Sequence, residues 1–207
     1  MKFINPIILF LDNDPVKSAS YLTNVHLEQG IKNSCQILLC SIYYMLGFRT
    51  KTIFKYYFCK ERWEETRFKY FSNYPLKTIP KYSFYNSQES RWCRKCHDHY
   101  KYVVNYFESM LNEYAFRFNS DHPLYEMYDF LRILPMEMGV RYGFKFPKLK
   151  NKNQFQLPWK NLPLKYRRKD IILGYREYYK STILSPDAFI GTKRDVPDFI
   201  LDKFNWL

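Results

Sequence analysis

Two long stretches of the sequence place apolar residues at helical spacing, and this feature constrains the fold more than any other. The first stretch contains Ala19, Leu22, Val25, Ile31, Cys35, Leu38 and Ile42, and the second contains Val103, Val104, Phe107, Met110, Leu111 and Tyr114. Side chains three or four residues apart lie on one face of an α-helix, so each stretch can bury one face. The sequence therefore predicts a mostly α, compact single-domain helical fold with long loops and a short N-terminal extended segment.

Capping residues and prolines set the predicted helix ends. Asp14 can accept a hydrogen bond from the first turn, and Pro15 suits the first helical position. We predict helices over about 15–46, with a bend near Gly30 and an end near Gly47, and over 98–118, 123–134 and 169–183. Residues 3–11 are expected to form a short buried strand or an extended segment, and 144–165 should be mostly irregular because they contain several prolines.

The chain shows no internal repeat and no clear boundary, so we expect residues 1–207 to form one domain. Insertions are predicted at about 48–90, with one short helix near 60–71, and at about 135–155. The C-terminal tail is expected to be held by Phe199, Phe204 and Trp206.

Composition limits the class of protein and its compartment. With 46% hydrophobic and 20% aromatic residues, the chain can bury a core and is not a disordered tail. The five apolar residues Ile7–Leu11 are too few for a secretory signal, and the longest mostly apolar run is too short to span a bilayer. Five cysteines, an odd number, suggest free thiols in a reducing compartment. We expect a protein that is neither secreted nor bound to a membrane.

Positive charge is concentrated in one part of the chain. The net charge is +13, and residues 141–180 contain 12 Lys or Arg but 2 Asp or Glu, whereas residues 105–138 contain 2 basic and 6 acidic residues. A basic stretch interleaved with aromatic residues is typical of proteins that bind a phosphate backbone. A solvated face, or a surface that docks on an acidic protein, would have the same composition.

The segment "WCRKCHDHY" contains four residue types that bind zinc. Structural zinc sites usually take two ligand pairs from separated segments. A second pair would have to come from Cys35, Cys40, Cys59 or His122, and none of these forms a CxxC or HxxxH pair. We therefore expect two thiols on the buried side of a helix start, and neither a metal nor a cofactor. The alternative zinc ligands are Cys93, Cys96, His97 and His99.

A polar stripe follows one side of the first predicted helix. His26, Gln29, Asn33 and Gln36 are spaced by three, four and three residues, so they share a face that has little charge. Neutral amides and an imidazole suit a concave surface that binds a base or a phosphate. An ordinary wet helix face is the competing interpretation.

Three segments resemble a family of phage and large-DNA-virus proteins that is largely uncharacterised. The segments are "LDNDP" at the start, "YKYVVNYFESMLNEYAFRFNSDHP" in the middle, and "LPLKYRRKDIILGYREYYKS" with "VPDFI" near the end. Members of the family have an Asp-x-Asp-Pro motif near the N-terminus and a histidine on the first helix. They also have an Asn-Glu-Tyr motif on the central helix and an Ala-Tyr-Arg-x-Tyr-Tyr motif near the C-terminus. This chain has Gly174 in place of the alanine.

A more distant resemblance is to the phage pyrimidine-dimer DNA glycosylase called endonuclease V. That enzyme forms a Schiff base through its terminal amine, assisted by a glutamate on its first helix. At the matching offsets from His26 this chain has Lys32, Asn33 and Gln36 where the enzyme has Arg, Glu and Arg. An amide cannot act as a base at neutral pH, so the resemblance implies an all-α fold and a DNA partner more than catalysis.

The resemblance implies a viral protein that binds double-stranded DNA. The likeness to the glycosylase adds damaged DNA as a possible form of this partner. Its location would be the host cytoplasm, the nucleus or the virion, with other viral proteins as further partners. Trp159 or Tyr166 could stack on exposed bases. The predicted DNA-binding residues are His26, Gln29, Lys32, Asn33 and Gln36 on the first helix, and Lys165, Arg167, Arg168, Lys169 and Arg176 near the end.

Two alternatives remain open at this stage. The first is an active glycosylase and lyase in which Lys32 or Lys17 replaces the terminal amine as nucleophile, with Asn33 as the other catalytic candidate. The second is a non-enzymatic structural or minor virion protein built on the same fold.

Overall fold

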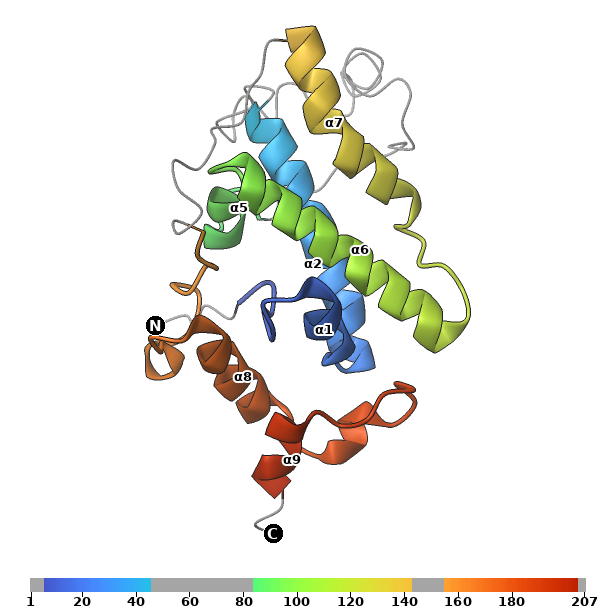
Figure 1. Ribbon diagram of the computed structural model, residues 1–207, viewed down its shortest axis with the longest axis vertical. Helices are drawn as coiled ribbons and strands as arrows, with labels where there is room; N and C mark the ends of the chain where they lie inside the picture. The colour runs from blue at the N-terminus through green and yellow to red at the C-terminus, as the bar shows by residue number, and fades with distance from the viewer. Residues whose placement is uncertain (1–5, 46–83, 143–154, 205–207) are drawn as a thin grey trace.

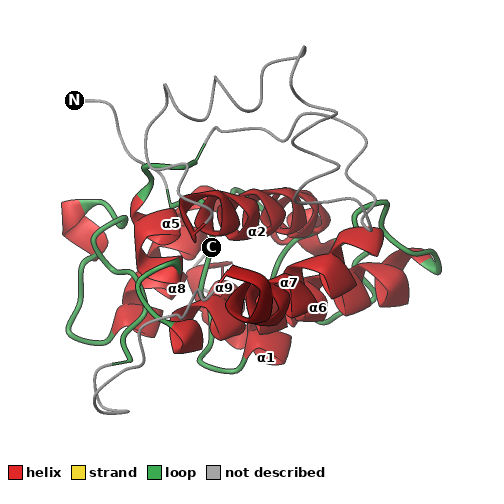
Figure 2. Ribbon diagram, turned by 90° about the horizontal axis from the view of Figure 1, so that it is seen from above, coloured by secondary structure: helices red, strands yellow, loops and turns green. Residues whose placement is uncertain are grey.

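The computed structural model describes residues 6–45, 84–142 and 155–204, and these residues form helices and no strand. The two long helices α2 (Asn24–Met45) and α6 (His97–Phe118) pack against each other at the centre of the fold. This arrangement confirms the predicted mostly α class (Figure 2). The remaining elements are α1 (Pro15–Ser20), α5 (Gln88–Cys93), α7 (Glu126–Tyr142), α8 (Ile171–Thr182), α9 (Asp198–Phe204) and the short 3₁₀ turns η3 (Leu164–Tyr166) and η4 (Pro186–Phe189).

The smaller helices surround this central pair. Helices α1, α5 and α7 pack on α6, whereas α8 and α9 lie together at the opposite end of the molecule from α7 (Figure 1). The ring of Phe10 is fully buried and lies 5.8 Å from the ring of Tyr106 on α6 and 5.4 Å from that of Tyr175 on α8, measured between centroids. The N-terminal segment therefore joins α8 to the core.

The predicted helix over 15–46 was wrong in one respect, because the chain leaves helical geometry between α1 and α2. The guanidinium of Arg117 donates to the backbone oxygens of Ser20 and Leu22, at 3.1 and 2.7 Å. The hydroxyl of Tyr179 accepts from the backbone N–H of Thr23 at 2.8 Å. These partners come from distant helices and satisfy backbone groups that a continuous helix would have used itself.

Helix α2 continues through Gly30, the position at which a bend was predicted. A Cβ atom at this position would lie 2.8 Å from the sulfur of Met110 on α6. The glycine therefore allows α2 and α6 to approach closely, and the helix continues through it.

The other predicted helices occur with shifted ends. Asp14 caps α1 by accepting from the backbone N–H of Val16 at 2.9 Å, as predicted, and Asp170 caps α8 in the same manner. The predicted helix over 98–118 is α6, and that over 169–183 is α8. Helix α7 was expected over 123–134 but ends at Tyr142 with Pro135 inside it, so it extends into the second predicted insertion.

Several predictions fall on residues outside the described ranges. These are the short helix near 60–71, most of the two insertions, and Trp206. The described part of the N-terminal segment, residues 6–11, is neither helix nor strand, and its Ile8, Phe10 and Leu11 are buried. Across the described helices, none is both long enough and apolar enough to traverse a bilayer.

Candidate nucleic-acid interface

Part of the predicted polar stripe lines one small cavity. His26, Gln29 and Asn33 on α2 face Tyr106 and Tyr178 across a space of about 190 Å³. Three of its four residues therefore lie beside a concave surface, but their polar atoms largely bind one another and the backbone.

Asn33 has both ends of its side chain occupied. Its Nδ2 donates to the backbone oxygen of Ile7 at 2.6 Å, and its Oδ1 accepts from Nε2 of Gln29 at 2.7 Å. With 8% of its surface exposed, Asn33 fixes the N-terminal segment against α2. Because both ends of the amide bind protein groups, Asn33 has a structural role and leaves no polar atom for a substrate.

His26 is held in a similar way. Its Nδ1 lies 2.7 Å from the hydroxyl of Thr23, and its ring meets the edge of the Tyr179 ring at 5.0 Å. Burial lowers the pKa of His26 below its usual value, so its ring favours the neutral form.

Lys32, a further candidate on α2, and Gln36, the fourth member of the stripe, do not line this cavity. Lys32 forms an ion pair with Glu28 at 2.6 Å, and 52% of its side chain is exposed. A lysine nucleophile is usually activated by removal from water, and Lys32 is not placed in such a site. Lys17 is exposed as well. The amide oxygen of Gln36 is buried and has no hydrogen-bond partner in the described part of the chain.

Arg176, one of the predicted DNA-binding cations, binds within the fold. Its Nε donates to the backbone oxygen of Leu11 at 2.7 Å, and its NH2 group forms an ion pair with Asp12 at 2.9 Å. Its guanidinium also lies over the rings of Tyr21 and Phe199. Arg176 therefore joins α8 to the start of α1 and to the tail, which gives Phe199 the role predicted for it.

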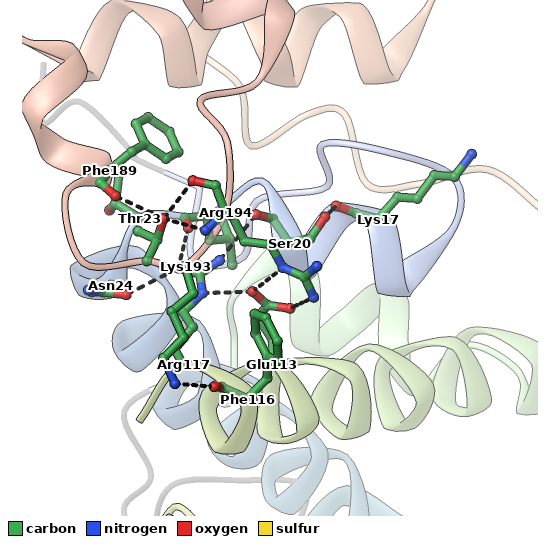
Figure 3. A network of polar contacts seen from close by, with 12 residues as sticks. Lys17, Ser20, Thr23, Asn24, Glu113, Phe116, Arg117, Phe189, Lys193 and Arg194 are labelled. Carbon is green, nitrogen blue, oxygen red and sulfur yellow. Dashed lines mark hydrogen bonds and ion pairs between the residues drawn. The ribbon is translucent and has the colours of Figure 1, made fainter. Parts of the chain in front are cut away.

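A second internal network connects α6 with the break between α1 and α2 (Figure 3). Glu113 accepts from Arg117 at 2.7 Å and from two nitrogens of Arg194 at 3.0 and 2.8 Å. Burial acts to raise the pKa of Glu113, but the hydrogen bonds and charges of Arg194 and Arg117 outweigh it and leave the pKa below its ordinary value. Glu113 is therefore a buried carboxylate with two arginine partners, and it stabilises the fold.

The other four cations predicted to bind DNA near the end of the chain differ in their contacts within the protein. Arg167 donates to the backbone oxygens of Leu162 and Lys160 at 2.8 and 2.7 Å, and Arg168 pairs with Glu177 at 2.8 Å. Lys165 lies over the ring of Tyr166, and Lys169 is exposed beside a second cavity. Arg167 and Arg168 are thus bound to protein oxygens, and Lys165 lies against an aromatic ring.

A larger cavity lies elsewhere, where α5 and the first turn of α6 meet residues 156–160. We call this cavity, about 440 Å³ in volume, the tryptophan pocket. Its two walls are joined by a hydrogen bond in which Nε1 of Trp92 donates to the backbone oxygen of Gln156 at 2.6 Å. The pocket is lined by Gln88, Arg91, Trp92, Lys95, His99, Gln156, Leu157, Pro158, Trp159 and Lys160, and none of these is acidic.

The side chain of His99 is part of this lining, and the residue is buried, with 2% of its surface exposed. Its ring stacks on Trp92, with 4.3 Å between the ring centroids and 16° between the planes. Its Nδ1 lies 2.9 Å from the backbone oxygen of Trp92, whereas its Nε2 is buried and has no hydrogen-bond partner among the described residues.

The zinc alternative finds no support in this geometry. No three His, Cys, Asp or Glu side chains in the described ranges are grouped so that they could hold a metal ion. Cys93 is fully buried, and burial raises the pKa of its thiol to about 12. Cys96 is the N-cap residue of α6, which begins at His97, and His99 faces the tryptophan pocket.

Four exposed cations surround the tryptophan pocket, and we call them the basic belt. Arg91, Lys95 and Lys160 line the pocket itself, and Lys169 lines the neighbouring cavity, which shares Gln156 and Leu157 with it. In the described part of the chain, none of the four forms an ion pair. Of these residues, sequence reasoning selected only Lys169. The available signal was the alternation of Trp with basic residues in "RWCRK" and "PWK".

Comparisons of the chain with protein-family models, with curated proteins and with solved structures give no match.

Proposed function

We propose that this chain is a DNA-binding protein, and that the basic belt around the tryptophan pocket binds the phosphate backbone. The observation that carries the proposal is a group of four exposed cations without ion-pair partners in the described chain, beside two tryptophans and a pocket lining that has no carboxylate. Elsewhere in the fold, Arg117, Arg168, Arg176 and Arg194 are paired with acidic side chains.

The chemistry of the belt suits a polyanion. Unpaired cations at a surface repel one another, and a phosphate backbone relieves this repulsion while it releases bound counterions. Trp159 is 37% exposed, and its ring lies 5.8 Å from Nζ of Lys160 and 5.7 Å from the guanidinium of Arg167. Aromatic and basic side chains in this combination are typical of nucleic-acid-binding surfaces. The resemblance to the phage and large-DNA-virus family makes DNA the nucleic acid we propose.

The proposal is tested by titrating a labelled, fully matched DNA duplex with the protein across a salt series. The triple variant Arg91→Ala/Lys95→Ala/Lys160→Ala should bind more weakly. The slope of log affinity against log salt should become less steep by about 0.9 for each phosphate contact that is lost.

The matched control removes three cations elsewhere: Lys17→Ala/Lys32→Ala/Arg132→Ala. It changes the net charge equally, and it includes Lys32, one of the residues predicted from the sequence. This control should retain most of the affinity and the wild-type slope. Equal losses in the two triple variants would contradict a localised interface. The absence of wild-type binding at about 0.15 M salt would favour a structural protein that docks on other proteins.

The same titration can test for catalysis. A duplex with one thymine dimer is incubated with protein and borohydride, which traps a Schiff base. We expect no adduct, because Lys32 is exposed and ion-paired and both ends of Asn33 are occupied. An adduct that is lost in Lys32→Ala would instead assign a lysine nucleophile.

A further inference from the structure

The tryptophan pocket has the size and the walls of a site for a small planar ligand. Its volume of about 440 Å³ lies within the range of about 300–1,000 Å³ that is usual for ligand pockets. Indole rings and proline provide flat apolar surfaces, and the amides of Gln88 and Gln156 provide both donors and acceptors at its edge.

His99 lines this pocket, and its imidazole has an unsatisfied acceptor. A backbone oxygen can only accept, so the contact between Nδ1 and the Trp92 oxygen requires the proton of a neutral imidazole to be on Nδ1. The lone pair of Nε2 is then an acceptor, and it is buried without a partner in the described chain. A buried acceptor without a partner is unfavourable, and a ligand that supplies an N–H group would remove this cost.

The ionisation of His99 agrees with an acceptor role. Burial lowers the pKa of His99, although the hydrogen bond to Trp92 acts in the opposite direction. A neutral ring presents a lone pair at Nε2, whereas a protonated ring would present a second N–H.

A nucleic-acid base fits these features together. A base has a flat π-face for stacking on Trp159 and N–H groups at its edge for Nε2 of His99. Its attached phosphates would lie near Arg91, Lys95 and Lys160 at the pocket rim. A paired base cannot enter, because its N–H edge is occupied by the partner base and both of its faces are stacked.

We propose that the tryptophan pocket binds one unpaired DNA base, stacked on Trp159 and donating an N–H group to Nε2 of His99. This inference rests on the proposed DNA-binding function and specifies the feature of DNA that the protein would select. Duplex DNA binds through the basic belt alone, and a duplex with an unpaired base gains the contacts of the pocket.

The experiment compares three labelled duplexes of one sequence by fluorescence anisotropy. The first is fully matched. The second has one adenine opposite an abasic spacer, so that this base is unpaired. The third has a spacer in both strands, so that the helix is interrupted but no base is available. We expect the second duplex to bind about 5- to 150-fold more tightly than the third, the range for stacking one base on one aromatic side chain.

Variants then assign the preference to the pocket. Trp159→Ala should give equal affinities for the second and third duplexes. Tyr125→Ala removes an aromatic ring of similar exposure elsewhere, at 45%, and should keep the preference. His99→Phe retains a ring against Trp92 but lacks Nε2, and it should reduce the preference. Urea unfolding of each variant shows whether it is folded.

The outcomes separate the two proposals. Binding to all three duplexes with no preference for the second, or a preference that persists in Trp159→Ala, would overturn the base pocket and leave the backbone interface standing. Absence of binding to every duplex would remove the proposed function and, with it, this inference.

Discussion

The polar side chains at the two ends of helix α6 differ in whether they have partners within the protein. Near its C-terminal end, Glu113 and Arg117 are buried, and each has several partners within hydrogen-bonding distance. Near its N-terminal end, Nε2 of His99 is buried without a partner in the described chain, and the cations around it are unpaired. The first group completes its interactions within the fold, whereas the second leaves them available to a ligand. Changes at the first should alter stability, and changes at the second should alter binding.

The largest effect is expected for Glu113→Ala. The change leaves the guanidinium of Arg117 buried, with 3% of its surface exposed, and without its carboxylate partner. Loss of one partner from a buried pair typically costs about 3–5 kcal/mol of unfolding free energy. Urea unfolding at pH 7 would measure it, and Asp129→Ala, which breaks an exposed pair with Arg132, should cost at most about 1 kcal/mol. Similar costs for the two variants would contradict the contrast between the ends of α6.

The Glu113 contribution should also depend on pH. The pKa of this carboxyl is lower in the folded protein than its reference value of 4.5. As the pH falls, the unfolded chain therefore binds a proton at Glu113 before the folded protein does. The stabilisation is therefore complete above about pH 4.5 and is lost as the pH falls through the folded pKa. The difference in unfolding free energy between wild type and Glu113→Gln should shrink over that window. A constant difference down to pH 3 would show that the charge of Glu113 has no part in it.

A smaller loss of stability is expected for Gly174→Ala. A Cβ atom at Gly174 would lie 2.4 Å from the backbone oxygen of Tyr166, so α8 and η3 would have to separate. Overpacking of this kind costs roughly 1–3 kcal/mol. Gly30→Ala meets only the flexible side chain of Met110 at 2.8 Å, and alanine favours helix, so its cost should be less. Thermal unfolding of the pair would rank them, and the reverse order would contradict this assignment.

The smallest effect on stability is expected for Arg91→Ala/Lys95→Ala/Lys160→Ala. These side chains are exposed and have no ion pair within the described chain, and such substitutions usually change stability by less than about 0.5 kcal/mol each. Urea unfolding should therefore match wild type, while DNA affinity falls. A loss of stability as large as that of Glu113→Ala would indicate that the basic belt is part of the fold.

Local signals in the sequence predicted the helices well. The cap at Asp14 and the apolar spacing from Val103 to Leu111 depend on neighbours in the chain, and both are found. The break between α1 and α2 depends instead on Arg117 and Tyr179, whose positions only the folded chain determines. For the same reason residue spacing could not indicate that Gly30 lies against Met110 of α6.

The candidate site was harder to predict than the helices. Residues on one helix face, such as His26, Gln29 and Asn33, do share a cavity because helical spacing places them together. The tryptophan pocket combines Trp92 with Gln156, which are far apart in the sequence and are joined by a single hydrogen bond. Spacing cannot indicate such a pair. The motif around Trp92 was therefore interpreted by its cysteines and histidines rather than by its basic residues.

The stacking of Trp92 on His99 also gives the molecule an optical property. The chain has four tryptophans, and two of them line the pocket. Indole emission shifts to shorter wavelength in a dry environment and is quenched by a stacked base or by a protonated imidazole. Occupation of the pocket would therefore be visible in the intrinsic fluorescence of the unlabelled protein, with Trp159 as the more solvent-exposed reporter.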